Sequence, residues 1–477
     1  MYAATTSVAL VGGDVRPVEV QVHVGRQNDQ FKLSGLPDTA VREAKDRVRA
    51  AVMSSGVQFP NRTVTVNLAP AHLPKSGTDF DLPIALGVLA ASREIPHPGP
   101  VVVVGELALD GRVRSGASSI GAAVLSARLG VPCLVSGGAA GDVAAVPGSR
   151  VHGVASLAQA VDLLRSGLER QGAAEAADPQ EPRPSADLAE VRGQHVARRA
   201  IEIAAAGRHH LLLHGPPGGG KTMLARRLPG ILPPLRDEEA VEVALVHAAA
   251  GLRRGLNRVR PFRSPHHTAS RAALVGGGSG VAVPGEVSLA HRGVLFVDEM
   301  AEFPRANLDT LRQPLEDGVV TVARRGVTAT FPSMFHLVAA TNPCPCGYRG
   351  DRRKPCECRP AVVARYRQRV SGPLLDRFDL VVSVGRLPAD DATGPDPDSS
   401  AEVRRRVAGA HERLADGTPE LDEGATALLF AALRDSLLTA RGVDRVRRVA
   451  TTICALAGGD RVAEEHVAEA MGLRVDW

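Results

Sequence analysis

A glycine-rich segment at residues 215–222, GPPGGGKT, constrains the fold of this 477-residue chain more than any other feature. It follows the short apolar run HLLLH (210–214) and precedes a helix-like stretch, MLARRLPGIL. In such a strand–loop–helix setting, G-x-x-x-x-G-K-T is typical of a loop whose backbone N–H groups surround phosphates at a helix N-terminus. The pattern predicts an α/β fold that binds a nucleotide through this loop. The loop residues are Gly215, Pro216, Pro217, Gly218, Gly219, Gly220, Lys221 and Thr222.

Two later apolar strands end in polar residues that fit the same site. We expect Lys221 to neutralise the outer phosphates and the Thr222 hydroxyl to bind Mg²⁺. One strand ends in Asp298 and Glu299, which are expected to hold Mg²⁺ through water and to polarise the attacking water. The next strand ends at Asn342, which could bridge the γ-phosphate and that water if the other two motifs are present. The acidic pair indicates hydrolysis of ATP rather than storage of the nucleotide.

Composition narrows the location and the partners. No apolar stretch approaches the ~20 residues of a membrane span, and the N-terminus lacks the basic region and cleavage site of a secretory signal, so we expect a cytoplasmic protein. The net charge is +5, and lysine occurs only at positions 32, 45, 75, 221 and 354. Abundant arginine suits phosphate contacts, although a GC-rich genome would also produce it. With 3% aromatic residues, stacking of bases on rings is disfavoured.

Two shifts in composition divide the chain. Residues 169–186 are rich in Ala, Pro, Glu and Gln, and residues 388–400 are rich in acidic and turn-forming residues, so both are interpreted as linkers. They separate an N-terminal domain (1–168), a central block (187–387) and a C-terminal helical segment (401–477).

The N-terminal domain shows its own mixture of patterns. Strict alternation at 18–24 predicts a strand, and apolar spacing at 39–54 predicts a helix. Apolar runs at 63–68, 101–104 and 132–135 predict further strands. These patterns indicate an α/β or α+β domain.

Four of the six cysteines lie in one short segment, as Cys344, Cys346, Cys356 and Cys358. Four thiolates suit one tetrahedral metal ion, and we favour structural Zn²⁺, although C-x-C pairs are less typical of zinc sites than C-x-x-C pairs. Reduced thiols in a loop are the alternative.

These motifs, with others along the chain, resemble the magnesium-chelatase-like branch of AAA+ ATPases and specifically the YifB/ComM family. The resemblance covers nearly the whole chain except the linkers. The segments that carry it are GLPDTAVREAKDRVRAA (35–51), FDLPIALGVLAAS (80–92), GELALDGRVR (105–114), DLAEVRGQ (187–194), PFRSPHHTAS (261–270), ALVGGG (273–278), PGEVSLAHRGVLFVDE (284–299), NPCPCG (342–347) and SGPLLDRFD (371–379).

The resemblance implies roles for two polar residues after the acidic strand. Asn342 would be sensor 1, and Arg377 would be an arginine finger that reaches the nucleotide of a neighbouring subunit. An arginine supplied by a neighbour implies a ring, and the family suggests a hexamer. A structural salt bridge from Arg377 to Asp376 or Asp379 is the alternative.

The resemblance also implies a C-terminal helical lid that carries sensor 2. Arg441 is the candidate for this role, with Arg445 and Arg448 on the same helix as alternatives. Val191 and Gln194 lie where the adenine pocket of the family begins.

The segment between Glu316 and Met334 predicts a β-hairpin with Arg324 and Arg325 at its tip. In helicases of this branch such hairpins line the pore, and arginines there would suit DNA phosphates; an exposed charged turn is the alternative. The Gly-rich stretch 261–285 is interpreted as an insertion whose loop His266 and His267 shape, with a role as ligands as the alternative.

The resemblance therefore implies, as the leading function, a hexameric, ATP-driven DNA motor such as a branch-migration helicase in recombination or natural transformation. The alternatives are a chelatase-type ATPase that remodels a protein partner for Mg²⁺ insertion and a chaperone-like ATPase.

The N-terminal domain resembles the Lon-type protease fold, which works through a Ser–Lys pair. Asp79 occupies the expected position of the serine, and no lysine occurs between residues 76 and 220. Ser76 beside Lys75 is only a neighbour in sequence, which does not make a catalytic pair. We therefore expect no peptidase activity.

Overall fold

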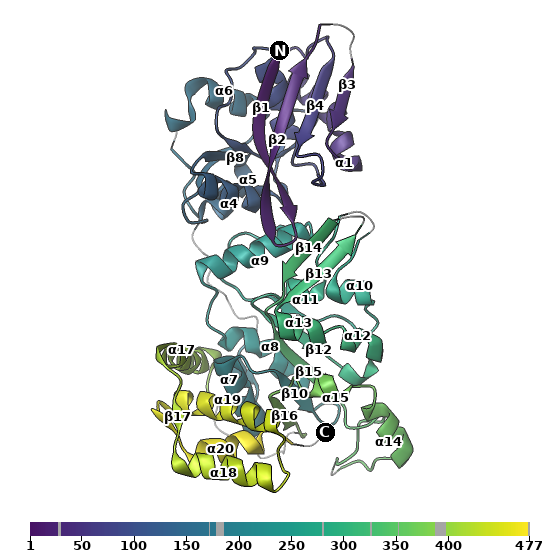
Figure 1. The fold of residues 1–477 in the computed structure, drawn as a ribbon, viewed down its shortest axis with the longest axis vertical. Helices are drawn as coiled ribbons and strands as arrows, with labels where there is room; N and C mark the ends of the chain where they lie inside the picture. The colour runs from purple at the N-terminus through teal and green to yellow at the C-terminus, as the bar shows by residue number, and fades with distance from the viewer. Residues whose placement is uncertain are drawn as a thin grey trace.

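The computed structural model describes residues 1–26, 30–170, 172–177, 186–278, 281–324, 327–351, 353–386 and 397–475. Three regions follow one another along the long axis, with the N-terminal strands at one end, the C-terminal helices at the other and the central α/β region between them (Figure 1). No helix among the described residues combines the length and the apolar character that crossing a membrane requires.

The N-terminal region is built on a seven-stranded mixed sheet, in the order β3-β4-β2-β1-β5-β8-β9. In β2 the alternating side chains are buried, as expected for a strand with one face on the core. The helix expected at 39–54 is divided at Glu43 into two helices. The strands are β1 (Tyr2–Val11), β2 (Asp14–Val24), β3 (Phe31–Ser34), β4 (Val64–Ala69), β5 (Val102–Val103), β8 (Pro132–Ser136) and β9 (Arg150–Val154), with β6 (Glu106–Leu107) and β7 (Val113–Arg114) as a separate pair. The helices are α1 (Thr39–Arg42), α2 (Ala44–Ser54), α3 (Asp81–Ala91), α4 (Ser119–Leu129), α5 (Gly137–Ala144) and α6 (Leu157–Ser166).

The central region contains a parallel five-stranded sheet in the order β11-β12-β15-β10-β16. Its strands are short, and most of their apolar residues are buried, as is usual for parallel sheets, whose faces are covered by helices. The strands are β10 (Leu211–His214), β11 (Phe262–Arg263), β12 (Val294–Val297), β15 (His336–Thr341) and β16 (Leu380–Ser383). The helices are α7 (His195–Gly207), α8 (Lys221–Ile231), α9 (Asp237–Ala249), α10 (Arg271–Val275), α11 (Glu286–Leu289), α12 (Arg305–Asp309), α13 (Arg312–Asp317), α14 (Pro360–Arg367) and α15 (Gly372–Leu375).

The strand order decides which loops meet. The carboxyl ends of parallel strands lie at one edge of the sheet, where α/β proteins bind their ligands. β15 lies between β10 and β12, so the residue after β15 lies between the loop after β10 and the acidic residues after β12. The sheet topology therefore brings together three segments that are far apart in the sequence.

An antiparallel hairpin of β13 (Val319–Arg324) and β14 (Val327–Pro332) extends from the central region toward the N-terminal region (Figure 1). The turn between β1 and β2 contacts it, because the backbone N–H of Gly13 donates to the Thr330 carbonyl over 3.0 Å. A Cβ atom on Gly12 would lie 2.3 Å from the same oxygen, so this close approach requires glycine. Helix α9 adds Ala244 and Leu245 to an apolar cluster of the N-terminal region.

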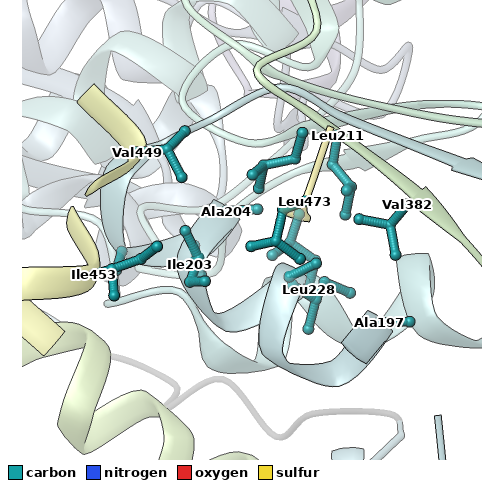
Figure 2. Close-up of a cluster of buried hydrophobic side chains, with 14 of the residues drawn as sticks. Ala197, Ile203, Ala204, Leu211, Leu228, Val382, Val449, Ile453 and Leu473 are labelled. Carbon is teal, nitrogen blue, oxygen red and sulfur yellow. The ribbon is translucent and has the colours of Figure 1, made fainter. Parts of the chain in front are cut away.

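The C-terminal region consists of α17 (Ser400–Asp416), α18 (Glu423–Arg434), α19 (Ala440–Ala457) and α20 (Glu464–Gly472), with the short strands β17 (Glu420–Leu421) and β18 (Arg461–Val462). Its apolar side chains share one buried cluster with α7, α8 and the sheet (Figure 2). Ile453 and Val449 of α19 lie on the same side of this cluster as Ile203 of α7. The C-terminal helices are therefore packed onto the central region through a common core.

Candidate functional site

The glycine-rich loop joins β10 to α8 as a sharp turn at the carboxyl edge of the sheet. A Cβ atom on Gly215 would lie 2.0 Å from the Val384 carbonyl oxygen, so only glycine allows this packing against the segment after β16. Gly220 has a φ of +91° and is the N-cap of α8, a backbone conformation that favours glycine. The loop therefore presents the free N–H groups of a helix N-terminus, which bind anions.

Lys221 points back into this loop. Its Nζ donates hydrogen bonds to the carbonyls of Gly215 (2.7 Å) and Pro216 (2.9 Å) and to Oδ1 of Asn342 (3.2 Å). Burial lowers the pKa of Lys221 to about 8, and the nearby carboxylates of Asp298 and Glu299 oppose this shift. Neutral carbonyls only partly offset the burial of an ammonium group, so an anionic phosphate suits this position.

Thr222 and Asp298 meet at the same edge of the sheet. Thr222 Oγ1 donates to Oδ2 of Asp298 over 2.8 Å, and the Glu299 backbone N–H donates to the other oxygen over 2.9 Å. A hydroxyl and a carboxylate oxygen this close are hard ligands of the kind that Mg²⁺ prefers. The residues present therefore fit the Mg²⁺–nucleotide site that the motifs predict.

Glu299 is the most accessible carboxylate of this group, with a side chain 57% exposed. Nδ1 of His267 lies 3.4 Å from one of its oxygens, and the His267 ring contacts the edge of the Phe303 ring. β11 and β12 are parallel neighbours, so the loop after β11 reaches the same edge of the sheet as Glu299. The sequence predicts that His267 shapes its loop, with a ligand role as the alternative. Its contact with Glu299 depends on the strand order, which the PHHT motif does not reveal.

The two residues expected at the adenine pocket differ in their surroundings. Val191 is 1% exposed. The Gln194 side-chain amide donates to the carbonyls of Gly219 (3.1 Å) and Gly385 (2.6 Å). Gln194 therefore fixes the phosphate loop to the segment after β16.

Arg377 lies at the opposite edge of the sheet. It comes just before β16, whereas the phosphate loop comes just after β10, and the two strands are parallel with Leu211 opposite Leu380. Arg377 lines a cleft of about 730 Å³ together with His209, Asp376 and Arg445. Burial and the neighbouring Arg441, Arg445 and Arg312 lower the pKa of the Arg377 guanidinium, so the candidate finger and the candidate sensor 2 residue belong to one basic cluster.

Ion pairs distinguish the arginines of this cluster. Arg377 pairs with Glu316 rather than with the adjacent aspartates. Arg445 lies 3.8 Å from Asp376, and Arg448 lies 2.8 Å from Asp379. Burial raises the pKa of Asp379, but the charges of His209, whose Nδ1 lies 3.7 Å away, and of Arg448 hold it at about 2. Arg441 has no carboxylate partner within the ranges that the structure describes.

The cysteine segment follows Asn342 directly. The four Sγ atoms of Cys344, Cys346, Cys356 and Cys358 lie within 4.8 Å of one another, and each cysteine is free of disulfide bonds. A hydrogen bond from the backbone N–H of Tyr348 is the main cause that lowers the pKa of Cys346 to about 6. The structure therefore groups four sulfur ligands of the kind that soft metal ions prefer.

Of the two residues predicted to contact DNA, the structure describes only the backbone of Arg324. Arg324 is the last residue of β13, while its side chain and the whole of Arg325 lie outside the described residues.

The candidate protease residues in the N-terminal region do not face one another. Lys75 is fully buried, and its Nζ donates to the Pro70 carbonyl, whereas Ser76 is exposed. Asp79 is buried and accepts a hydrogen bond from the Ser118 backbone N–H over 3.0 Å. Burial raises the pKa of Asp79.

Comparison with known proteins supports the resemblance along the whole chain. The model of magnesium chelatase subunit ChlI matches residues 187–392, and two further models, of a ChlI-subunit segment and of the ChlI C-terminal segment, match residues 18–135 and 416–474. The uncharacterized protein YifB of Salmonella typhimurium is 41% identical over 98% of this chain and 96% of its own length. The competence protein ComM of Haemophilus influenzae is 39% identical over 99% of this chain and 97% of its own length.

A weaker similarity is confined to a shorter segment. A probable DNA helicase MCM9 of Arabidopsis thaliana is 25% identical over 40% of this chain and 24% of its own length. The predicted resemblance to the YifB and ComM proteins is thus confirmed, and the likeness to a helicase is partial.

Proposed function

Because the chain belongs to the magnesium-chelatase-like family of the YifB and ComM proteins and is an AAA+ ATPase of that type, we propose that it is a ring-forming motor that couples ATP hydrolysis to the movement of DNA. The observation that carries the proposal is the position of the phosphate loop and of Arg377 at opposite edges of one sheet. The N-terminal and C-terminal regions would accompany each motor unit as a Lon-like domain and a helical lid.

Each residue at the carboxyl edge has a distinct role in hydrolysis. Lys221 would neutralise phosphate charge, and Thr222 and Asp298 would hold Mg²⁺, which when bound supplies positive charge where negative charge develops. Glu299 would accept a proton from the attacking water. Asn342 would orient that water, and its bond to Lys221 supports this role because it already lies beside the phosphate-binding ammonium.

Geometry supports a ring. β10 and β16 are paired over four residues, from Leu211 with Leu380 to His214 with Ser383. At about 3.3 Å per residue, their two ends are about 10 Å apart, and Arg377 lies beyond one end while the phosphates would lie beyond the other. Arg377 would therefore serve the nucleotide of a neighbouring subunit, in the head-to-tail contact that closes a ring.

The surroundings of the three candidate arginines favour Arg441 as the sensor 2 residue. It clusters with Arg377, whereas Arg445 and Arg448 are each paired with an aspartate. Arg441 would thus act on the same neighbouring nucleotide as Arg377. The family suggests six subunits.

Two observations support DNA as the substrate. The β13–β14 hairpin carries Arg324 and Arg325 near its turn, and guanidinium groups suit the phosphate backbone. The partial similarity to a probable DNA helicase and the similarity to the competence protein ComM point in the same direction. The motor would act on branched or single-stranded DNA during recombination or uptake.

The test is an ATPase and strand-displacement assay with forked and four-way DNA. We expect branched DNA to stimulate hydrolysis and ATP to drive strand displacement, with both lost in Lys221→Ala. The matched control is Lys32→Ala, a lysine of β3 remote from the site. ATPase activity that no DNA stimulates would contradict the proposal that DNA is the substrate, but it would not affect the assignment as an ATPase.

The second candidate is a motor that remodels a protein partner. The match to magnesium chelatase subunit ChlI favours it, because the same site could drive a change in a bound protein. Hydrolysis stimulated by a co-purified protein and unaffected by DNA would support this alternative.

A further inference from the structure

The long loop at residues 342–359, between β15 and α14, contains neither helix nor strand in its described residues. It is rich in proline, glycine and charged residues, so it can bury little apolar surface. Structureless loops longer than about 12–15 residues are uncommon in compact domains and are usually functional. Another interaction must therefore offset the entropy of holding this loop in place.

The four thiols supply the geometry of a metal site. Sγ of Cys344 lies 3.3 Å from that of Cys346 and 3.6 Å from that of Cys356, and Cys346 and Cys356 are also 3.6 Å apart. A Zn–S distance of about 2.3 Å in a tetrahedron places sulfurs about 3.8 Å apart, whereas a disulfide requires about 2.05 Å. The observed spacing is close to that of a mononuclear tetrahedral site, and Cys344 is fully buried within it.

We propose that Cys344, Cys346, Cys356 and Cys358 bind one Zn²⁺ ion and that the loop closed by this ion positions Asn342 and the phosphate loop for hydrolysis. The metal site stands on its own geometry, and its link to hydrolysis rests on the proposed ATPase function.

The first turn of the loop contacts the nucleotide site directly. Cys344 follows Asn342 by two residues, and the Gly347 backbone N–H donates to the Cys344 carbonyl over 2.9 Å. Gly347 has a φ of +83°, and a Cβ atom there would lie 2.7 Å from Cδ of Pro217. The turn that carries two of the sulfurs thus packs against the phosphate loop on one side and fixes Asn342 on the other.

The second half of the loop is anchored to the segment after β16. The Tyr348 ring contacts two cations, Nζ of Lys354 (4.2 Å from the ring centre) and the Arg386 guanidinium (5.7 Å). Arg386 also pairs with Asp351 over 2.9 Å. Arg386 follows Gly385, whose carbonyl binds Gln194, so both halves of the loop connect to residues around the phosphate loop.

Without the ion, the loop would keep the contacts of Gly347, Tyr348 and Asp351 but lose the link between its two halves. The described apolar cores do not include any residue of the loop, so the domains should remain folded while Asn342 loses its support. The contacts of Lys221 with Gly215 and Pro216 do not depend on the loop. Loss of zinc should therefore reduce the rate of hydrolysis more than the affinity for ATP.

The experiment measures zinc and hydrolysis separately on the full chain. Elemental analysis should find one zinc per chain in the wild type and less than about a tenth of that in Cys356→Ser. Cys358→His, which replaces one zinc ligand with another, should keep the metal. The control is Cys133→Ala, a buried cysteine of β8 outside the cluster, which should keep both zinc and activity.

We expect kcat for ATP hydrolysis to fall about tenfold or more in Cys356→Ser, in line with the effect of losing support around a site, with the Kd for ATP within about threefold of the wild type and Tm showing a folded protein. Activity in Cys358→His should follow its zinc content. A wild type without zinc would overturn the metal site, and an unchanged kcat in zinc-free Cys356→Ser would overturn the link to hydrolysis. A wild type with zinc but no ATPase activity would contradict the proposed function and leave the metal site supported.

Discussion

His267 lies beside Glu299, with its Nδ1 atom 3.4 Å from a carboxylate oxygen. The Glu299 side chain is largely exposed, so packing does little to fix its carboxylate. The imidazole supplies a partner at the distance of a long hydrogen bond or ion pair. We therefore propose that His267 positions the carboxylate expected to activate water.

Replacing His267 with alanine should lower kcat for ATP hydrolysis about fivefold, the equivalent of one hydrogen bond of about 1 kcal/mol, with little change in the Kd for ATP. Steady-state ATPase rates and nucleotide titration separate the two effects. The matched control is His72→Ala, an exposed histidine of the N-terminal region. An equal loss of kcat and binding would indicate a structural role for His267 instead.

Glu299→Gln should retain ATP binding and lose hydrolysis by about 10²–10⁴-fold, the usual contribution of a general base. The amide keeps the shape of the side chain but cannot accept the proton. Single-turnover hydrolysis with bound ATP checks this directly. A residual rate within tenfold of the wild type would assign proton transfer to another group.

The affinity for ATP should decrease as the pH rises above about 8. Burial lowers the pKa of Lys221 to about 8 in the free protein, and phosphates favour the charged ammonium, so above this pH binding must be accompanied by uptake of one proton. The Kd should then rise by up to tenfold per pH unit, which nucleotide titrations between about pH 7 and pH 9.5 would measure.

The titration of Lys221 should also affect the stability of the protein, which should increase as the pH rises while the affinity for ATP decreases. Between pH 8 and the ordinary lysine pKa of 10.5, an unfolded chain binds more protons at Lys221 than the folded one, so this contribution to the free energy of unfolding rises with pH. The control for the ATP-affinity prediction is Lys221→Arg, in which the guanidinium stays charged over this pH range. The affinity of this variant for ATP, although lower, should not change with pH. A slope that persists in Lys221→Arg would contradict the assignment to this residue.

The sequence predicted those parts of the site that depend on local pattern and strand order. The phosphate loop is a continuous segment, and Asp298 and Asn342 follow strands whose carboxyl ends meet at one edge. The contact of His267 with Glu299 depends on β11 and β12 being neighbours, and the pairing of Arg377 with Glu316 depends on how α13 packs. Neither of these two contacts produces a periodic pattern in the sequence from which it could be predicted.

Contacts between the N-terminal and central regions could not be predicted from the sequence either. The packing of Gly12 and Gly13 against Thr330 joins residues more than three hundred positions apart, and a Gly-Gly pair in the sequence indicates only a turn. The break of the 39–54 helix at Glu43 was likewise obscured, because the apolar spacing continues through it. Local pattern thus predicts elements, whereas their junctions require the folded chain.

The N-terminal region should lack peptidase activity. Nζ of Lys75 is bonded to a backbone carbonyl while Ser76 is exposed, and a buried aspartate, Asp79, stands at the position expected for a nucleophile. The full chain should leave casein intact with and without ATP. Degradation abolished by Ser76→Ala would overturn this expectation, whereas degradation that survives the substitution would indicate a contaminant.

Arg377→Ala should lower kcat by about 10³-fold, as for the loss of an arginine finger, while ATP binding is retained. The decisive measurement mixes this variant with Lys221→Ala, each inactive alone. A chain with Arg377→Ala keeps an intact phosphate loop, and a Lys221→Ala neighbour offers an intact Arg377. In randomly mixed rings with equal amounts of each chain, about a quarter of the sites would combine the two intact halves at one head-to-tail contact. Hydrolysis should therefore reappear on mixing.

The ion pair with Glu316 provides the control for that experiment. If Arg377 served only to hold α13 within its own chain, Glu316→Ala would reduce hydrolysis as severely as Arg377→Ala, and mixing would restore nothing. If Arg377 serves the neighbour, Glu316→Ala should keep most of the activity, because the guanidinium then lacks only an exposed carboxylate partner, whose ion pair contributes little. Size-exclusion chromatography of each variant would verify that the chains still assemble.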